Sequence, residues 1–410
     1  MQETKVLHKK KVLAPKLRFK GFEDAWIKSR LGDIATITTG NTPSTTVTEY
    51  YNGPKLFVSP ADINENRYVY KTKTTLTDLG FKQGRKITKG SVLFVCIGST
   101  IGKVGQAADE CLTNQQINAL NAMNEFDNNF IYAILERNGK KIKLLAGTQA
   151  VPQINKTDFS NFKYNFPTLP EQQKIAAFLS AVDEKIQLLN KKKQLLEQYK
   201  KGVMQQLFSG KLRFKGHTDK WKKVVFTECC DLIHGFQFRE EHFESTGLPV
   251  IKIGSLVDNG SISFHNATYV SKDCEHTHSK FILKKGDVLM ALTGGTLGKV
   301  SLIDKDYGVI FQNYRVGKFE NKSNSIKKYI YFLLQSNLVQ NRIQSLVNEA
   351  AQPNFGKQDF DKIKFSLPSL EEQKKIADFL SAIDVKIESL SNQISQTQNF
   401  KKGLLQQMFV

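Results

Sequence analysis

The feature that most constrains this chain is an internal repeat, in which the same sequence blocks occur twice in the same order. Residues 16–21 recur letter for letter as 211–216, and Trp26 has its match at the same offset in Trp221. We call the full set of paired blocks the frame, and it also includes 98–104 with 294–300, 169–186 with 370–387, and 200–208 with 401–409. A repeat in fixed order implies one structural unit present twice.

The segments between the frame blocks differ. Residues 41–89 have little in common with residues 236–285. Such a contrast is expected when two related modules do the same job on different targets. Ordinary drift of loops is the alternative, but drift explains less well why the frame stayed so similar.

Each half opens with a globular part in which apolar runs are short and separated by Gly, Asn and Asp. Short runs of this kind predict β-strands. The expected strands are 55–58, 91–95, 250–253 and 287–290. Apolar residues at helical spacing predict helices over 129–145 and 326–347. We therefore expect two mixed α/β domains, each around a curved sheet.

Each half closes with a long helix. Thr168-Leu-Pro-Glu171 and Ser369-Leu-Glu-Glu372 both have the form of a capping box, in which hydroxyl and glutamate satisfy free backbone N–H groups of the first turn. From each box an apolar heptad repeat continues, which predicts a coiled-coil partner. The seam holds residues 175, 182, 189, 196, 203 with 179, 186, 193, 200, 207, and 376, 383, 390, 397, 404 with 380, 387, 394, 401, 408.

An antiparallel pairing of these two helices would need no long connector. The predicted fold is thus α/β, with two repeated globular domains separated by two long antiparallel coiled-coil helices and related by a pseudo-two-fold axis. The expected boundaries are 1–167 and 211–368 for the domains, and 168–210 and 369–410 for the spacer helices.

The charge of the chain indicates its partner. Lys and Arg number 59 against 39 acidic residues, which gives a net charge of +20. Such an excess attracts polyanions, because binding to phosphates releases condensed counterions. A basic surface that only aids solubility is the alternative. We favour nucleic acid, because the chain has no membrane motif.

Composition also bounds the compartment. No apolar run approaches the ~20 residues of a membrane span, and residues 1–11 are charged without an apolar stretch after them. The five cysteines are odd in number and form no CxxC pair. Reduced thiols in a cytoplasmic protein fit this pattern best.

Two glycine blocks, 98–103 and 294–299, invite comparison with a phosphate-binding loop. The Walker form has four residues between its glycines and a Ser or Thr after its lysine. Here three residues separate the glycines, and Val104 and Val300 follow the lysines. A tight turn between strands is the better interpretation, although Lys103 and Lys299 could still contact DNA phosphates from it.

Other candidate sites are weak. Cys274-Glu-His-Thr-His278 looks like a metal cluster, but structural zinc sites usually have two ligand pairs and no second pair follows. Asp183-Glu-Lys185 and Glu372-Gln-Lys374 have a nuclease-like spacing, yet both lie on the predicted coiled coil, where a solvated charged face explains them. No methyltransferase motif occurs, so we predict neither a catalytic residue nor a metal site.

Candidates for DNA contact are the polar and basic residues of the divergent segments. Arg, Asn and Gln read base edges, whereas Lys, Ser and Thr mostly hold phosphates. For any single candidate, a solvated surface residue is an equally good interpretation. The candidates are Asn41, Thr42, Ser44, Thr45, Arg67, Lys82, Arg85 and Lys86 in the first copy, and Gln237, Arg239, Lys272, His276, His278 and Lys280 in the second.

Gly202 and Gly403 each follow a Lys-Lys pair inside a predicted long helix. Glycine in a helix interior costs ~1 kcal/mol relative to alanine. Its presence in both copies suggests that a partner packs close to the backbone there, and a harmlessly tolerated glycine is the alternative.

The whole arrangement resembles the specificity subunit of type I restriction–modification enzymes. The residues that carry the resemblance are Trp26 with Leu31-Gly-Asp33, the 98–103 turn and its copy, and the blocks 169–175 and 370–376 that follow Pro167 and Pro368. The block Pro-x-x-Glu-Gln-x-x-Ile at the start of a long helix is very typical of this family. One departure is residues 221–228, which lack the Leu-Gly-Asp form.

The resemblance implies a non-catalytic subunit whose two domains each read one half of a split, asymmetric site in double-stranded DNA. It implies that the helices set the spacing and dock two methyltransferase subunits, and that helicase–nuclease restriction subunits then join. S-adenosylmethionine, ATP and Mg²⁺ would belong to these partners, with no cofactor on this chain. The alternative is a stand-alone DNA-binding or coiled-coil scaffold protein, and an enzyme in its own right is the weakest hypothesis.

Overall fold

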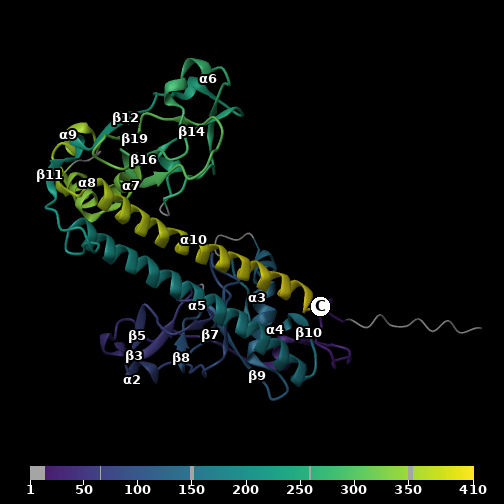
Figure 1. The fold of residues 1–410 in the computed structure, drawn as a ribbon. Helices are drawn as coiled ribbons and strands as arrows, with labels where there is room; N and C mark the ends of the chain where they lie inside the picture. The colour runs from purple at the N-terminus through teal and green to yellow at the C-terminus, as the bar shows by residue number, and fades with distance from the viewer. Residues whose placement is uncertain (1–13, 65, 148–151, 258–259, 350–353) are drawn as a thin grey trace, which may run out of the picture. The chain divides into compact units, whose positions relative to one another are not determined.

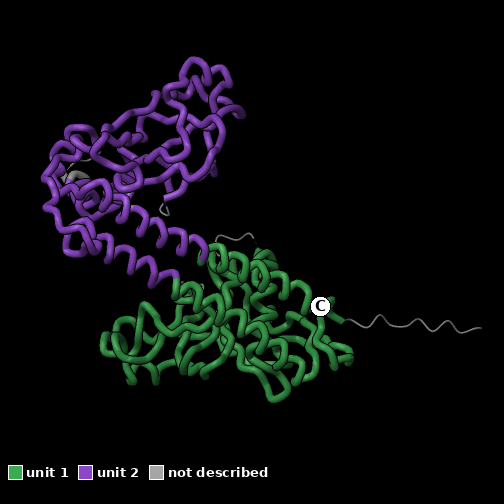
Figure 2. The backbone as a smooth tube through the Cα atoms, viewed as in Figure 1, with its two compact units in different colours: residues 1–192, 390–410 green, residues 193–389 purple. Residues whose placement is uncertain are grey.

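The computed structural model describes residues 14–64, 66–147, 152–257, 260–349 and 354–410. The chain divides into two compact units (Figure 2). Unit 1 consists of residues 1–192 and 390–410, and unit 2 of residues 193–389. Each unit therefore combines one globular part with the start of one long helix and the end of the other. The charged segment 1–11 lies outside the described residues.

Unit 1 contains a five-stranded sheet of order β2-β9-β6-β7-β4, a three-stranded sheet of order β5-β3-β8, and the antiparallel pair β1-β10 (Figure 1). The strands are β1 (Ile27–Arg30), β2 (Ala35–Thr39), β3 (Tyr51–Val58), β4 (Tyr68–Val69), β5 (Thr74–Leu76), β6 (Val92–Val95), β7 (Val104–Ala107), β8 (Cys111–Thr113), β9 (Ile117–Ala122) and β10 (Lys163–Phe166). The helices are α1 (Leu31–Ile34), the 3-10 turn η1 (Thr48–Tyr50), α2 (Asp78–Phe81), α3 (Asn128–Leu144), α4 (Lys156–Asn161) and the start of α5 (Leu169–Phe208).

Unit 2 contains two four-stranded sheets, of order β12-β19-β16-β17 and β13-β15-β14-β18, and the antiparallel pair β11-β20. The strands are β11 (Lys222–Val225), β12 (Cys230–His234), β13 (Phe243–Glu244), β14 (Leu248–Ile251), β15 (Thr268–Val270), β16 (Val288–Ala291), β17 (Val300–Leu302), β18 (Phe311–Gln312), β19 (Val316–Asn321) and β20 (Lys364–Leu367). The α-helices are α6 (Cys274–Thr277), α7 (Lys327–Gln335), α8 (Asn337–Glu349), α9 (Lys357–Phe360) and the start of α10 (Leu370–Gln407). The 3-10 turns are η2 (Phe226–Glu228), η3 (Glu240–His242), η4 (Ile253–Ser255), η5 (Ser279–Phe281) and η6 (Gly294–Thr296).

The sequence repeat is also a repeat of topology. The order β2-β9-β6-β7 in unit 1 returns as β12-β19-β16-β17 in unit 2, and β5-β3-β8 returns as β15-β14-β18. Even the one parallel contact of the smaller sheet recurs, between β3 and β8 and between β14 and β18. Two repeated mixed α/β domains with open sheets are therefore confirmed, and each predicted strand overlaps a strand of the structure.

The helix predictions fared unequally. The helix expected over 129–145 is α3, which begins where the Asp127 side chain accepts a hydrogen bond from the Phe130 backbone N–H. Its apolar face is buried against the larger sheet of unit 1. The single helix expected over 326–347 is wrong, because it is divided into α7 and α8. Ser336 is extended between them, and its hydroxyl donates to the Leu333 carbonyl.

Within each unit, the start of one long helix packs against the end of the other. In unit 1, Ile175 and Leu179 of α5 share a core with Leu404 and Met408 of α10. In unit 2, the end of α5 shares a core with the start of α10 through Val203, Leu207, Ile376 and Leu380. All eight side chains occupy predicted seam positions. Their burial supplies a large apolar contribution to stability.

One ion pair recurs between the helix segments of each unit. The Lys401 ammonium lies 2.6 Å from the Asp183 carboxylate in unit 1. The Lys200 ammonium lies 2.6 Å from the Asp384 carboxylate in unit 2. Lys200 and Asp183 occupy the frame positions that Lys401 and Asp384 occupy in the second copy. The frame thus carries a polar contact that fixes the register of the helix segments as well as their apolar seam.

The helix starts are held by arginines of the first frame block. The Arg18 guanidinium makes two hydrogen bonds of 2.7 Å to the Glu171 carboxylate, and Arg213 pairs in the same way with Glu372. The predicted capping boxes are therefore incomplete, because both glutamates bind arginine instead of a backbone N–H. Only the hydroxyl half is present in the second copy, where the Glu372 backbone N–H donates to the Ser369 hydroxyl.

Candidate nucleic-acid interface

In unit 1, the segment that follows β2 is joined to the segment that follows α2. The Asn41 side-chain amide donates to the Gln83 carbonyl, and its oxygen accepts from the Arg85 backbone N–H at 2.8 Å. The Arg85 guanidinium donates to the Thr39 carbonyl at 2.8 Å. Two predicted candidates, Asn41 and Arg85, are thus brought together, and Arg85 is exposed to solvent.

A third segment joins this surface at the turn between β8 and β9. The Thr42 hydroxyl donates to the Gln115 side-chain oxygen at 2.8 Å. Gly40 allows the backbone after β2 to lie this close to the end of β8, because a Cβ there would lie 2.2 Å from the Thr113 carbonyl oxygen. The exposed candidate Thr42 is therefore brought to the turn, and Gln115 is an exposed residue that the sequence reasoning missed.

Four of the remaining candidates of residues 41–89 lie on the surface, and the fifth, Arg67, lies in the interior. Ser44, Thr45, Lys82 and Lys86 are exposed. The Ser44 hydroxyl is hydrogen-bonded to that of Thr46, and the Lys86 ammonium lies 5.5 Å from the centre of the Phe81 ring. Their side chains remain accessible to a phosphate, but the structure shows no contact that gathers these four at one point.

Arg67 has a structural role. It is only 4% exposed, and its guanidinium donates to Gln106 at 2.5 Å and to Asn129 at 2.7 Å. It also forms an ion pair with Asp183 of α5 and lies over the Tyr132 ring. Every nitrogen of the guanidinium is occupied inside the unit, so this candidate is corrected: Arg67 joins the domain to the helix and is not available to DNA.

The two glycine blocks are turns between strands, as predicted. Residues 98–103 connect β6 to β7, and residues 294–299 connect β16 to β17 through η6. Lys103 is exposed and its ammonium donates to the Ile63 carbonyl at 3.0 Å, while Lys299 is half-buried. The turns place both lysines at equivalent positions of the two domains.

In unit 2, aromatic and histidine side chains of the divergent segment 236–285 form a cluster. The His278 ring lies 4.2 Å from the Phe236 ring and 5.6 Å from the Phe238 ring, centre to centre. The His242 ring nitrogen accepts from the Arg239 backbone N–H at 3.0 Å. The candidates Arg239 and His278 therefore come together around two phenylalanines, and Gln237 between those phenylalanines is exposed.

The other candidates of unit 2 surround the short helix α6. Lys272, His276 and Lys280 are all exposed. The Lys280 ammonium lies 5.0 Å from the centre of the Phe281 ring. Among the residues that the structure describes, no three His, Cys, Asp or Glu side chains lie together as possible metal ligands.

The turn between β18 and β19 corresponds to the turn that holds Gln115. It carries Tyr314 and Arg315, and the Arg315 side chain is exposed. His234 approaches this turn, since its ring nitrogen lies 3.3 Å from the Tyr314 carbonyl oxygen. These residues were not among the sequence candidates, because they lie outside the longest divergent segments. The signal was present in the two aligned stretches Thr-Asn-Gln-Gln and Gln-Asn-Tyr-Arg, where Asn114 and Asn313 agree and their neighbours differ.

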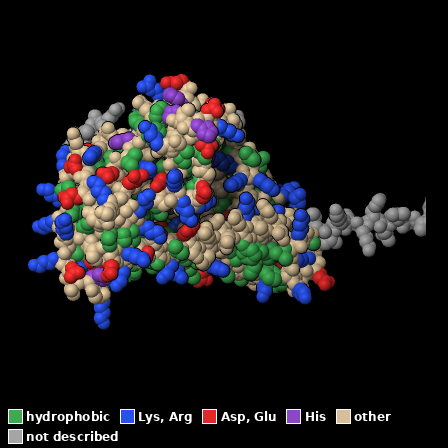
Figure 3. Space-filling model, turned by 45° about the horizontal axis from the view of Figure 1, so that its top comes forward, with side chains coloured by type: hydrophobic (Ala, Val, Ile, Leu, Met, Phe, Trp, Pro, Cys, Tyr) green, Lys and Arg blue, Asp and Glu red, His purple; other side chains and the backbone are tan. Residues whose placement is uncertain are grey.

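Basic side chains are spread widely over the face shown in Figure 3, where they outnumber acidic ones. The distribution agrees with the net charge of +20. A surface of this kind attracts a polyanion without sequence preference and leaves discrimination to particular side chains.

Four of the five cysteines are buried and take no part in this surface. Cys96 and Cys111 are buried, and burial raises the pKa of each thiol to about 12. Burial also raises the pKa of Cys229 to about 11. A thiol that stays protonated is a poor nucleophile and a poor metal ligand. These cysteines therefore act as small apolar core residues.

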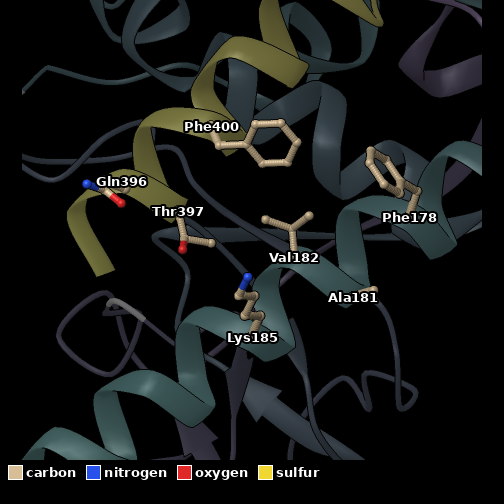
Figure 4. Close-up of a pocket in the computed structure, with 7 residues that line it drawn as sticks. All are labelled: Phe178, Ala181, Val182, Lys185, Gln396, Thr397 and Phe400. Atoms are coloured by element: carbon tan, nitrogen blue, oxygen red, sulfur yellow. The ribbon is translucent and has the colours of Figure 1, made fainter. Parts of the chain in front are cut away.

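Unit 1 has an open groove of about 400 Å³ between α5 and α10. Phe178, Val182 and Lys185 of α5 face Thr397 and Phe400 of α10 across it (Figure 4). The Phe400 side chain is 56% exposed. An apolar groove of this kind on a helix surface is typical of a place where another protein packs.

The two predicted docking glycines leave open space. A Cβ added at Gly202 or at Gly403 would meet no heavy atom within 4 Å outside its own helix turn. Nothing within the described chain therefore explains glycine at these positions. A partner that approaches the backbone remains a proposal, which the groove beside α10 supports.

No described helix is long and apolar enough to cross a bilayer.

Comparison with known proteins identifies the repeat. The model of the type I restriction modification DNA specificity domain matches residues 23–198 and again residues 218–398. The chain belongs to this family. The two specificity domains, so defined, include the globular part of each half and most of the long helix that follows it.

The specificity domains have relatives over nearly the whole chain. The type I restriction enzyme MjaVIII specificity subunit of Methanocaldococcus jannaschii is 26% identical over 394 residues, which are 93% of this chain and 91% of that protein. The type I restriction–modification system S subunit from M. genitalium has the same fold, with a TM-score of 0.62 at 19% identity over 97% of this chain and 99% of that one. A chain from a structure of type I restriction–modification assembly covers 94% of this chain with a TM-score of 0.56 at 16% identity.

Proposed function

We propose that this chain is the DNA-sequence specificity subunit of a type I restriction–modification complex. The observation that carries the proposal is the pair of equivalent polar surfaces, one in each specificity domain, built on the same strands with different side chains. A protein that reads two different half-sites needs this combination of constant scaffold and variable contacts. The membership of the family and the basic charge support the same conclusion.

In this proposal each domain reads one half of a split, asymmetric site in double-stranded DNA. The domains correspond to residues 1–167 and 211–368, and the helices over 168–210 and 369–410 act as the spacer. The length of α5, which runs from Leu169 to Phe208, suits that role, since a helix rises ~1.5 Å per residue and remains stiff. The recurring Lys–Asp pairs would hold the helix register on which the spacing depends.

The methyltransferase subunits would dock on the exposed side of the helices. Phe400 at the groove of unit 1 has its frame equivalent in Tyr199 of unit 2, and both rings are more than half exposed. Each lies one helix turn before the open glycine, Gly403 or Gly202. Two equivalent surfaces would take two methyltransferase chains. Restriction subunits would join them, and S-adenosylmethionine, ATP and Mg²⁺ would be bound by these partners.

The experiment is a methylome of cells that carry the methyltransferase gene with and without this chain. We expect methylated adenines in one split motif only when both are present. The purified chain with S-adenosylmethionine should neither methylate nor cut DNA, and native mass spectrometry should give a complex of one specificity chain and two methyltransferases. Methyl transfer by the chain alone would contradict the proposal. Sequence-specific binding without any effect on methylation would favour a stand-alone DNA-binding protein.

A further inference from the structure

The two specificity domains share one turn whose backbone is constant and whose side chains are not. In unit 1 the turn lies between β8 and β9, and in unit 2 between β18 and β19. Asn114 and Asn313 begin these turns. The next two residues are Gln115 and Gln116 in the first domain, but Tyr314 and Arg315 in the second.

Hydrogen bonds show that the two turns have the same geometry. The Asn114 side-chain oxygen accepts from the Gln116 backbone N–H at 3.1 Å, and that of Asn313 accepts from the Arg315 backbone N–H at 3.4 Å. The carbonyl of the last turn residue accepts from the strand beside it in both domains, from Cys96 at 2.8 Å and from Leu292 at 3.0 Å. The side chains of Gln116 and Arg315 therefore leave equivalent points of the scaffold.

Each turn also lies against the start of the first divergent segment. Gly40 and Gly235 make equivalent approaches, since a Cβ at Gly235 would lie 2.2 Å from the Gln312 carbonyl oxygen. Phe236 forms a bridge with Asn313, just as Thr42 in the first domain bonds to Gln115. The turn is therefore part of the candidate interface in both domains, although the frame blocks do not include it.

Arg315 is presented by its neighbour. Its Nε donates to the Tyr314 hydroxyl at 2.7 Å, and its guanidinium carbon lies 5.3 Å from the centre of the Tyr314 ring. Within the described part of the chain, no residue accepts from its two terminal nitrogens. A guanidinium that is oriented through Nε keeps both terminal nitrogens for a pair of parallel hydrogen bonds. The O6 and N7 acceptors of guanine in the major groove suit such a pair.

We propose that Arg315, positioned by Tyr314, reads a guanine in the half-site of the second specificity domain. The inference rests on the proposed function. The equivalent residue in the first domain, Gln116, is a neutral amide that is hydrogen-bonded to Asn114, so the first domain should lack this guanine contact. The chain would thus use one scaffold position for different base preferences in its two half-sites.

The test uses the complete complex of this chain with its methyltransferase. The wild-type methylome first gives the split motif, and one of its half-sites should contain a guanine–cytosine pair that depends on Arg315. With Arg315→Gln, methylation should spread to other bases at that position while the other half-site stays unchanged. Gln116→Ala is the matched control, because it alters the equivalent position of the other domain and should leave this guanine required.

Binding to modified duplexes separates base reading from phosphate binding. Replacing the guanine by 7-deazaguanine removes the N7 acceptor and so one of the two hydrogen bonds of the bidentate contact, which should weaken wild-type binding by at least about 5-fold. The Arg315→Ala complex should bind both duplexes equally. Tyr314→Phe removes the acceptor that orients Nε, so it should reduce the preference for guanine but leave affinity for unrelated DNA unchanged.

Three results would overturn the inference while leaving the proposed function intact. One is a wild-type motif without a guanine–cytosine pair in the half-site read by the second domain. Another is an equal loss with Arg315→Ala on every duplex, which would make Arg315 a phosphate contact. The third is no change in binding or motif with a correctly folded variant, as judged by its thermal unfolding. Absence of any motif in the wild type would instead contradict the proposed function itself.

Discussion

A buried charge network in unit 1 supports the sharpest stability prediction. Asp183 of α5 accepts from Arg67 at 3.3 Å and lies 2.6 Å from the Lys401 ammonium of α10, and Lys401 also binds Glu136 of α3. The side chains of Arg67, Lys401 and Asp183 are 3%, 10% and 12% exposed. The network has two positive and two negative groups, so it is balanced as long as Asp183 is present.

Asp183→Asn keeps the shape of the side chain and removes its charge. Two buried cations would then remain with one carboxylate, that of Glu136, which binds Lys401. Breaking a buried ion pair from one side costs ~3–5 kcal/mol, and the lower end applies here because the amide oxygen still accepts a hydrogen bond. For a unit of this size, ~1 kcal/mol shifts the melting temperature by about 2–4 °C. We therefore expect unit 1 to melt about 6–12 °C lower.

The second unit offers a matched control. Asp384 is the frame equivalent of Asp183, but it pairs with Lys200 alone and is 34% exposed. Loss of such a partly exposed pair costs about 0–1 kcal/mol, so Asp384→Asn should shift melting by less than about 4 °C.

Each unit contains one of the two tryptophans, Trp26 and Trp221. Fluorescence melting in Trp221→Phe and Trp26→Phe backgrounds therefore reports the units separately. Equal shifts for the two aspartate variants would refute the argument that the network makes Asp183 special.

Three further predictions address the helix start, the spacer and the recognition domains. Burial alone would raise the pKa of Glu372, but hydrogen bonds from Arg213 and Trp221 outweigh it and hold the pKa below its ordinary value of 4.5. The stability that comes from a lowered carboxyl pKa is present above the unfolded pKa and is lost as pH falls. Glu372→Gln should therefore lower the melting temperature at pH 7, and the difference from wild type should shrink on acidification below about 4.5. Leu196→Pro breaks α5 in its interior at a cost of ~3 kcal/mol or more. Binding to the full split site should therefore fall while both globular domains stay folded, and the control Leu196→Ala should bind nearly as well as wild type. Unchanged binding of Leu196→Pro in gel-shift assays would contradict a spacer role. Exchanging residues 41–159 for the same region of a related protein should change one half of the methylated motif only, since well-separated base contacts contribute nearly additively. Single-molecule sequencing reads the motif, and a change in both halves or in the gap would show that the domains are not independent.

The sequence predicted the parts of the fold that depend on local pattern. The heptads over 169–208 and 370–407 and the short apolar runs were sufficient for both long helices and for the four strands that were expected. The break at Ser336 was not predictable in the same way, because neither Gly nor Pro marks it. The serine hydroxyl bonds back to the Leu333 carbonyl where the helix ends, and α7 then packs against the sheet while α8 packs against α7.

The candidate site was predicted less well for a different reason. Asn41, Arg85, Arg239 and His278 lie in the two candidate surfaces, and their contact with DNA stays a prediction. Arg67 does not, since its partner Asp183 is 116 residues away in sequence. A contact at that separation leaves no local pattern, so a buried arginine and a DNA-reading arginine look alike in a divergent segment.

Comparison of the two copies is a better guide to function than charge is. Residues that recur at equivalent positions, such as Lys200 with Lys401, make the same contact in both units, and their repetition is explained by structure. Gln116 and Arg315 have the same backbone hydrogen bonds but different chemistry. Folding requires the turn and its asparagine, and it places little demand on the exposed side chain that follows. Where the scaffold is held constant and the exposed side chain differs, the two domains can present different chemistry to what they bind.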